Sequence, residues 1–122
     1  MLLIGLSVSI LNVTPTNMAK FYALIVTVAL FDLIAEYAGK MWVLEGKSIY
    51  LWLTCAGFGA AGFFFALSLK YEGVAIANIL WIALTIILVT LMGYFVFKEH
   101  LSPINILGMA VIVLGIILVN LK

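Results

Sequence analysis

The chain has 122 residues, of which 67% are hydrophobic and only 9% are charged. Soluble proteins are about 45–50% apolar and about 25% charged, and a soluble domain of this length cannot bury so much apolar surface, so the composition predicts an integral membrane protein. The net charge of +1 excludes the basic surface that nucleic acid requires, and the single Cys55 excludes an internal disulfide and a multi-cysteine zinc site.

The first segment of the chain, residues 1–13, is apolar but short. At about 1.5 Å per residue its helix reaches only about 20 Å, whereas a bilayer core is about 30 Å thick. It also lacks the positive region and the small-residue cleavage site of a signal peptide. We expect residues 1–15 to form an apolar extension, either at the membrane interface or as a short fifth helix.

The first long helix is expected over residues 16–44. Thr14 is suited to cap its start, and Pro15 suits the first helical position because a proline lacks the N–H that would be unpaired there. Gly46 is a typical residue just beyond a helix end. This helix carries three charged residues in its second half, Asp32, Glu36 and Lys40.

The rest of the chain contains three uncharged stretches that each meet the length of about 20 residues needed to cross a bilayer. The connections between them are too short for anything but antiparallel neighbours. We therefore predict an all-α integral membrane protein, a single domain over residues 1–122 in which four transmembrane helices form a bundle. The three further helices are expected at residues 48–69, 73–97 and 101–121.

Four spans place both termini on one side of the membrane. Lys and Arg in short loops set the orientation of a membrane protein, but here three lysines lie on the side of the termini and two or three on the other. Such a weak bias permits insertion in both orientations and hence an antiparallel homodimer. The alternative is that one or two charges still decide a single orientation.

Asp32, Glu36 and Lys40 are spaced four residues apart, so they share one face of the first helix. A charged residue near the bilayer centre costs about 2.5–3.5 kcal/mol on insertion scales, and such residues normally face the bundle interior or a water-filled cavity. Either Asp32 or Glu36 is then a proton carrier, and we expect Glu36. The alternative is a permanent structural ion pair between Glu36 and Lys40.

The third helix offers polar partners for this face. Asn78, Trp81 and Thr85 share a face by their three- and four-residue spacing. They either line a polar site that meets Glu36 or act as hydrogen-bonding contacts between helices, which contribute about 0.6 kcal/mol each.

Small residues mark two further helices. Residues 56–62 of the second helix are rich in Gly and Ala, which allows close approach of a neighbouring helix. In the fourth helix, Gly108 and Gly115 lie seven residues apart with Ile112 between them. This spacing predicts a helix–helix seam, either within one subunit or between two.

Four motifs together resemble the small multidrug resistance family, within the wider drug/metabolite transporter superfamily. They are Ala35-Glu36 late in the first helix, Gly73-Val74-Ala75 opening the third, the stretch from Phe97 to Ser102 before the fourth, and the segment from Gly108 to Ile116. The last is similar to the dimerisation segment Gly-x-x-x-Ile-x-x-Gly-Val of that family. The resemblance covers residues 19–121.

The resemblance implies an antiparallel dimer in the bacterial inner membrane, in which Glu36 binds either protons or a cationic substrate. It implies proton-coupled export of a small cationic or amphipathic compound, with Asp32, Lys40, Asn78 and Trp81 as further candidates for the proton and substrate site. Lys40 departs from the family pattern because its charge offsets the attraction of Glu36 for cations. The subunit interface would contain Gly108, Ile112, Gly115 and Ile116.

Two other interpretations remain open. Subunits of lipid-linked sugar flippases share the Gly-Val-Ala opening and the Glu-x-Leu-Ser sequence before the fourth helix, and Lys40 would meet a lipid phosphate as a point charge. Such a chain would work as one half of a heterodimer. A non-transporting membrane subunit is the third interpretation. We expect membrane lipids, protons and the substrate as partners, and no enzyme activity, cofactor or metal.

Overall fold

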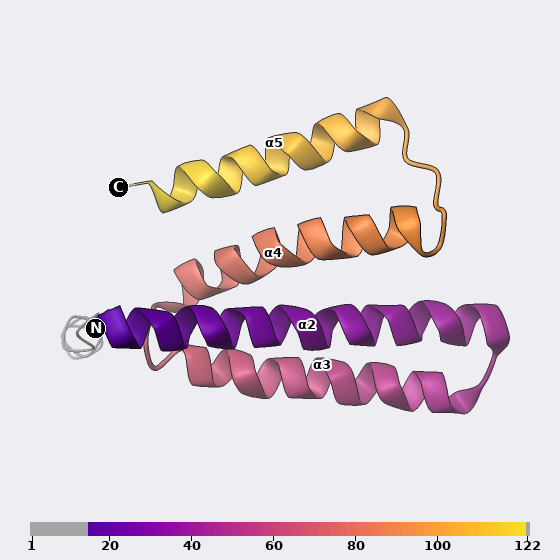
Figure 1. Ribbon diagram of the computed structural model, residues 1–122, viewed down its shortest axis with the longest axis horizontal. Coiled ribbons are helices and arrows are strands. Elements are labelled where there is room, and N and C mark those ends of the chain that lie inside the picture. The colour runs from indigo at the N-terminus through magenta and orange to yellow at the C-terminus, as the bar shows by residue number, and fades with distance from the viewer. Residues whose placement is uncertain (1–14, 122) are drawn as a thin grey trace.

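The structure is a computed structural model that describes residues 15–121, and the expected N-terminal segment at residues 1–13 lies outside this range. The predicted all-α fold is confirmed, and each of the four helices is long and apolar enough to cross a membrane. The protein is a multi-pass membrane protein. Its described helices are α2 (Pro15–Glu45), α3 (Ser48–Ser68), α4 (Val74–Phe95) and α5 (Pro103–Asn120), shown in Figure 1.

The helix ends follow from local chemistry. Gly46 ends α2 in a left-handed conformation with φ of 73°, and its N–H donates to the Trp42 carbonyl at 2.7 Å. At the start of α5, the Ser102 hydroxyl accepts from the Asn105 N–H while the Asn105 side chain accepts from the Ser102 N–H. Pro103 follows at the first helical position. These signals give a sharp turn before α3 and a fixed start to α5.

The helices lie in the order α3, α2, α4, α5 across the view of Figure 1, with both ends of the described chain on the same side. Helix α2 occupies the middle and packs closely against α3 and less extensively against α4, whereas α5 packs loosely on α4. Its 31 residues make α2 about 46 Å long, which exceeds a bilayer core and accommodates a tilt or an extension into the interface.

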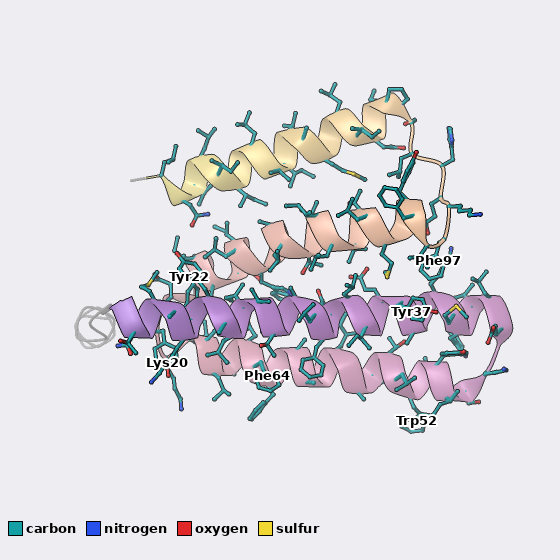
Figure 2. All side chains as sticks on the ribbon, in the orientation of Figure 1. Lys20, Tyr22, Tyr37, Trp52, Phe64 and Phe97 are labelled. Carbon is teal, nitrogen blue, oxygen red and sulfur yellow. The ribbon has the colours of Figure 1, made fainter. Side chains whose placement is uncertain are left out.

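Small residues form the seam between α2 and α3. Ala35 and Ala38 of α2 are buried there, as are Gly57 and Ala61 of α3. A Cβ atom added to Gly57 would lie 2.8 Å from the Cβ of Ala35, so the backbones approach as closely as the sequence pattern predicts. Large side chains such as Trp52, 72% exposed, point outward toward the lipid (Figure 2).

A compact apolar cluster sets the position of α4 against α2. Phe21 and Ile25 of α2 and Ala77 of α4 are buried together. Phe65 of α3 packs against the same cluster and against the ring of Trp81, with the ring centroids 5.3 Å apart. This packing fixes the rotation of α4 and therefore which of its side chains face α2.

Candidate functional site

Asp32 lies near the middle of α2 and is only 4% exposed. Its Oδ2 atom accepts hydrogen bonds from Trp81 Nε1 at 3.1 Å and from the Thr85 hydroxyl at 3.3 Å. Trp81 and Thr85 are four residues apart on α4, so both donors point toward α2 from one helical face. A buried carboxyl group thus has two neutral hydrogen-bond donors that hold its orientation.

A cavity of about 340 Å³ adjoins this carboxyl group. It lies between α2, α4 and α5, and both Asp32 and Glu36 line it. Glu36 is half-buried one helical turn beyond Asp32 and, within the described part of the chain, has no hydrogen bond or ion pair. The remaining lining residues are Trp81, Ile82, Thr85, Ile86, Val89, Thr90, Met109 and Ile112.

Lys40 has a different partner from the one that the helical spacing predicts. Its Nζ atom lies 3.6 Å from Glu99 Oε1, in the connection between α4 and α5. The alternative of a structural ion pair between Glu36 and Lys40 is therefore wrong for this conformation. Helical spacing does not indicate Glu99 as a site residue, and the only sequence signal for it is its place in the polar turn before α5.

The predicted polar face of α4 is brought to α2. Trp81 and Thr85 form interhelical hydrogen bonds with Asp32, and both also line the cavity that Glu36 lines. Asn78 is half-buried nearly one turn earlier on α4 and does not line the cavity. The packing of α4 against Phe21 and Ile25 sets this register, which sequence spacing alone does not determine.

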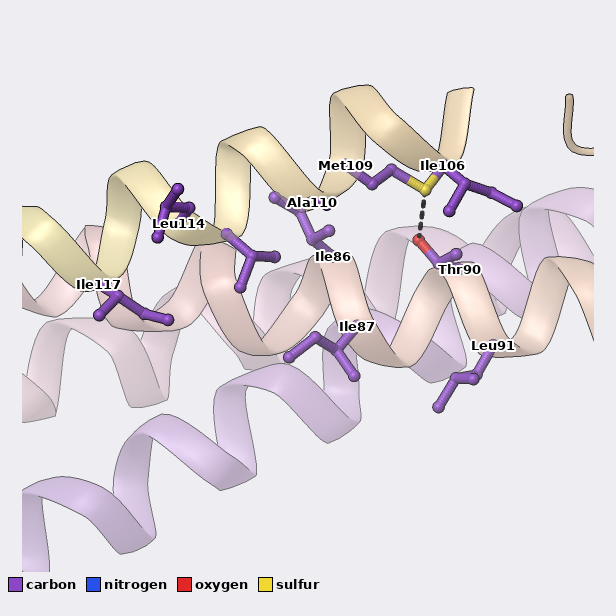
Figure 3. A pocket seen from close by; sticks show the side chains of 10 residues that line it. Ile86, Ile87, Thr90, Leu91, Ile106, Met109, Ala110, Leu114 and Ile117 are labelled. Carbon is purple, nitrogen blue, oxygen red and sulfur yellow. Dashed lines mark hydrogen bonds between the residues drawn. The ribbon is translucent and has the colours of Figure 1, made fainter. Parts of the chain in front are cut away.

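Helix α5 leaves most of its surface open. Among its residues, all of which the structure describes, none is buried. Gly108 and Gly115 have no neighbouring atom within 4 Å of an added Cβ, and Ile112 is half-exposed while lining the Asp32 cavity from the side of α5. An apolar groove of about 530 Å³ lies between α4 and α5, where the Thr90 hydroxyl contacts the Met109 sulfur at 3.7 Å (Figure 3).

The family is identified by comparison with individual known proteins, since no family model matches the chain. The chain is 32% identical over 81 residues to the quaternary ammonium compound-resistance protein QacG of Staphylococcus sp. (strain ST94). The aligned region covers 66% of this chain and 69% of QacG. The chain belongs to the small multidrug resistance family. The family resemblance of the sequence motifs is thereby confirmed.

Two further relatives extend the comparison. It is 33% identical over 64 residues to the uncharacterized membrane protein YvaE of Bacillus subtilis (strain 168), covering 52% of this chain and 54% of YvaE. It is 37% identical over 70 residues to the probable 4-amino-4-deoxy-L-arabinose-phosphoundecaprenol flippase subunit ArnE of Pseudomonas savastanoi pv. phaseolicola (strain 1448A / Race 6), covering 57% of this chain and 60% of ArnE. The matched region thus spans about half the length of YvaE and somewhat more of ArnE.

The relatives whose names state a role are a resistance protein and a flippase subunit, and neither is an enzyme. Within residues 16–121 the structure places no group of three or more His, Cys, Asp or Glu side chains where they could hold a metal ion. The site presents carboxyl groups beside an aromatic ring in a cavity between α2, α4 and α5.

Proposed function

We propose that this protein exports a small cationic or amphipathic compound across the bacterial inner membrane in exchange for protons, with Glu36 as the exchanging group. One observation carries the proposal: two carboxyl groups, Asp32 and Glu36, line one cavity between membrane-spanning helices, beside the ring of Trp81. A carboxylate at this depth requires a proton or a cation to offset its charge. The family relative QacG is named for resistance to quaternary ammonium compounds, a cationic class.

The two carboxyl groups have different surroundings, which supports different roles. Asp32 accepts from Trp81 and Thr85 and is held in place as a fixed acceptor. Glu36 has no such donors, so its carboxyl group is open to whichever positive partner enters the cavity. Trp81 adds an aromatic surface suited to cation–π contact with an organic cation. Proton and substrate then exclude one another at Glu36, and that exclusion couples their movements.

The proposed assembly is an antiparallel dimer. The faces of α5 that carry Gly108, Ile112, Gly115 and Ile116 are the ones that a second copy would cover. Open space around Gly108 and Gly115 permits close approach of another helix, and no residue of α5 is buried by its loose packing on α4. The same geometry accepts either an identical subunit or a related one.

A flippase subunit for lipid-linked sugars is the second candidate. The observations that favour it are the match to ArnE and the position of Lys40, which lines a cavity together with Glu36. A lysine near the membrane interface can bind a lipid phosphate. Its pairing with Glu99 opposes this role, because the carboxylate occupies the position that a phosphate would take.

The pH dependence of cation binding tests the export proposal. The apparent Kd of the purified protein for benzyltrimethylammonium should rise as the pH falls, because a protonated Glu36 has no charge to attract the cation. For one displaced proton the limiting slope is about tenfold per pH unit. Calorimetric titrations over a series of pH values measure this slope. A Kd that does not change with pH contradicts proton exchange. If the protein binds no cation and instead co-purifies with a polyprenyl-phosphate lipid, the flippase function is favoured.

A further inference from the structure

A second cavity lies beside the first and carries a different set of charges. Its volume is about 380 Å³, and it shares Glu36 and Val89 with the cavity at Asp32. The charged residues that line it are Glu36 and Lys40 of α2 and Glu99 of the connection before α5. Asp32, one turn before Glu36, is the other charged group that faces this region. The two cavities therefore adjoin along α2, with Glu36 lining both.

Lys40 has two carboxylates within its reach. Glu36 is four residues earlier on the same helix, the spacing that favours a Glu–Lys ion pair. The ammonium group instead lies 3.6 Å from Glu99 Oε1. This ion pair is half-exposed, and pairs of that kind contribute little to stability. The Lys40–Glu99 ion pair matters because it sets the position of the Lys40 ammonium group, which lies beside Glu99 and not in an ion pair with Glu36.

The backbone of the α4–α5 connection places Glu99 for this contact. Lys98 has a left-handed φ of 52°, which turns the chain back, and the Glu99 N–H donates to the Gly93 carbonyl at 2.9 Å. The Glu99 carboxylate then lies against α4, where a Cβ on Gly93 would be only 3.0 Å from Oε2. The ring of Phe97 packs on Tyr37 of α2, with the centroids 5.6 Å apart. The Glu99 side chain thus lies close against Gly93 on its way to Lys40.

We infer that Glu99 determines the cation specificity of the site by holding the ammonium group of Lys40 away from Glu36. With Glu99 in place, the positive charge of Lys40 and the negative charge of Glu99 offset one another, and Asp32 and Glu36 leave the two cavities attractive to cations. Without Glu99, Lys40 turns to Glu36, neutralises it and repels a positive substrate. The inference rests on the proposed function, since it assigns a role in the same site.

The test is a double-mutant cycle on the full-length protein in detergent, with benzyltrimethylammonium as the probe. Glu99→Gln should raise the Kd about tenfold or more, because Lys40 then competes for Glu36. Lys40→Met should bind the probe more tightly than wild type, because the cation facing the cavity is gone. The double variant should recover at least the wild-type affinity. A double variant as weak as Glu99→Gln, or an unchanged Glu99→Gln, overturns the inference, since a mere loop anchor would not depend on Lys40.

A second readout needs no cation binding and separates this inference from the proposed function. Dicyclohexylcarbodiimide reacts with protonated carboxyl groups in apolar surroundings, and mass spectrometry of the peptide that contains Glu36 measures the reacted fraction. Glu99→Gln should lower that fraction, because Lys40 keeps Glu36 ionised, and Lys40→Met in the same chain should restore it. If wild type binds no cation, the export proposal fails, and the labelling alone decides the role of Glu99. Equal labelling in all variants contradicts it.

Discussion

Replacing Glu36 with glutamine is expected to reduce transport of a quaternary ammonium compound, driven by a pH gradient across proteoliposomes, by at least about a hundredfold. Glutamine preserves the shape of the side chain but neither binds an exchangeable proton nor carries a charge. Asp32 should not take over the role of Glu36, because Trp81 and Thr85 already donate hydrogen bonds to one of the Asp32 carboxyl oxygens. Uptake of a radiolabelled cation after an imposed pH jump measures the loss.

Glu45→Gln provides the matched control for this measurement. Glu45 ends the same helix but lies outside both cavities, where it is 3.7 Å from Lys47 in an exposed ion pair. Such pairs contribute at most about 1 kcal/mol, so Glu45→Gln should transport as wild type does. Transport that survives in Glu36→Gln, or is lost equally in Glu45→Gln, would show that Glu36 is not the coupling residue.

Gly57→Val is expected to have the largest effect on stability. The added Cβ would lie 2.8 Å from the Cβ of Ala35 and 3.1 Å from its Cα, and a rigid backbone atom cannot move aside as a flexible side chain can. Overpacking of this kind costs about 1–3 kcal/mol and sometimes more. Because α2 also carries Asp32 and Glu36, separating α3 from it should disturb the site as well. Titration of the micelles with a denaturing detergent, followed by circular dichroism, measures the free energy of unfolding.

Gly59→Val is the control for that substitution. It introduces the same side chain into the same helix two residues later, where no atom lies within 4 Å of the added Cβ. Its free energy of unfolding should stay within about 0.5 kcal/mol of wild type. Equal destabilisation by both substitutions would mean that the contact with α2 does not decide the result, because valine has a higher helix propensity than glycine at either position.

The sequence predicts the helices of this fold well because each depends on local properties. Apolar runs of sufficient length indicate the spans, and short charged connections separate them. Pro15 begins α2 because its fixed φ suits the first helical position, and Gly46 ends α2 because glycine readily adopts a left-handed conformation. The small residues of α3 also predict a close contact, although the pattern does not show that Gly57 faces α2 and Gly59 does not.

The site is less predictable because it depends on contacts between distant segments. Helical spacing places Glu36 and Lys40 on one face but says nothing of Glu99, which reaches Lys40 only through the left-handed turn at Lys98. The partner of Trp81 depends likewise on the rotation and height of α4 relative to α2. The apolar packing at one end of the bundle sets both, so the Trp81 N–H donates to Asp32.

Proton release on cation binding tests the central claim, that proton and substrate exclude one another at Glu36. Purified wild-type protein is placed in weakly buffered detergent solution, and benzyltrimethylammonium is added while a pH electrode follows the solution. Acidification should grow with the amount of bound cation and saturate with it, and Glu36→Gln should release no protons. Equal release from both proteins, or cation binding by wild type without any release, would show that proton and substrate do not exclude one another at Glu36.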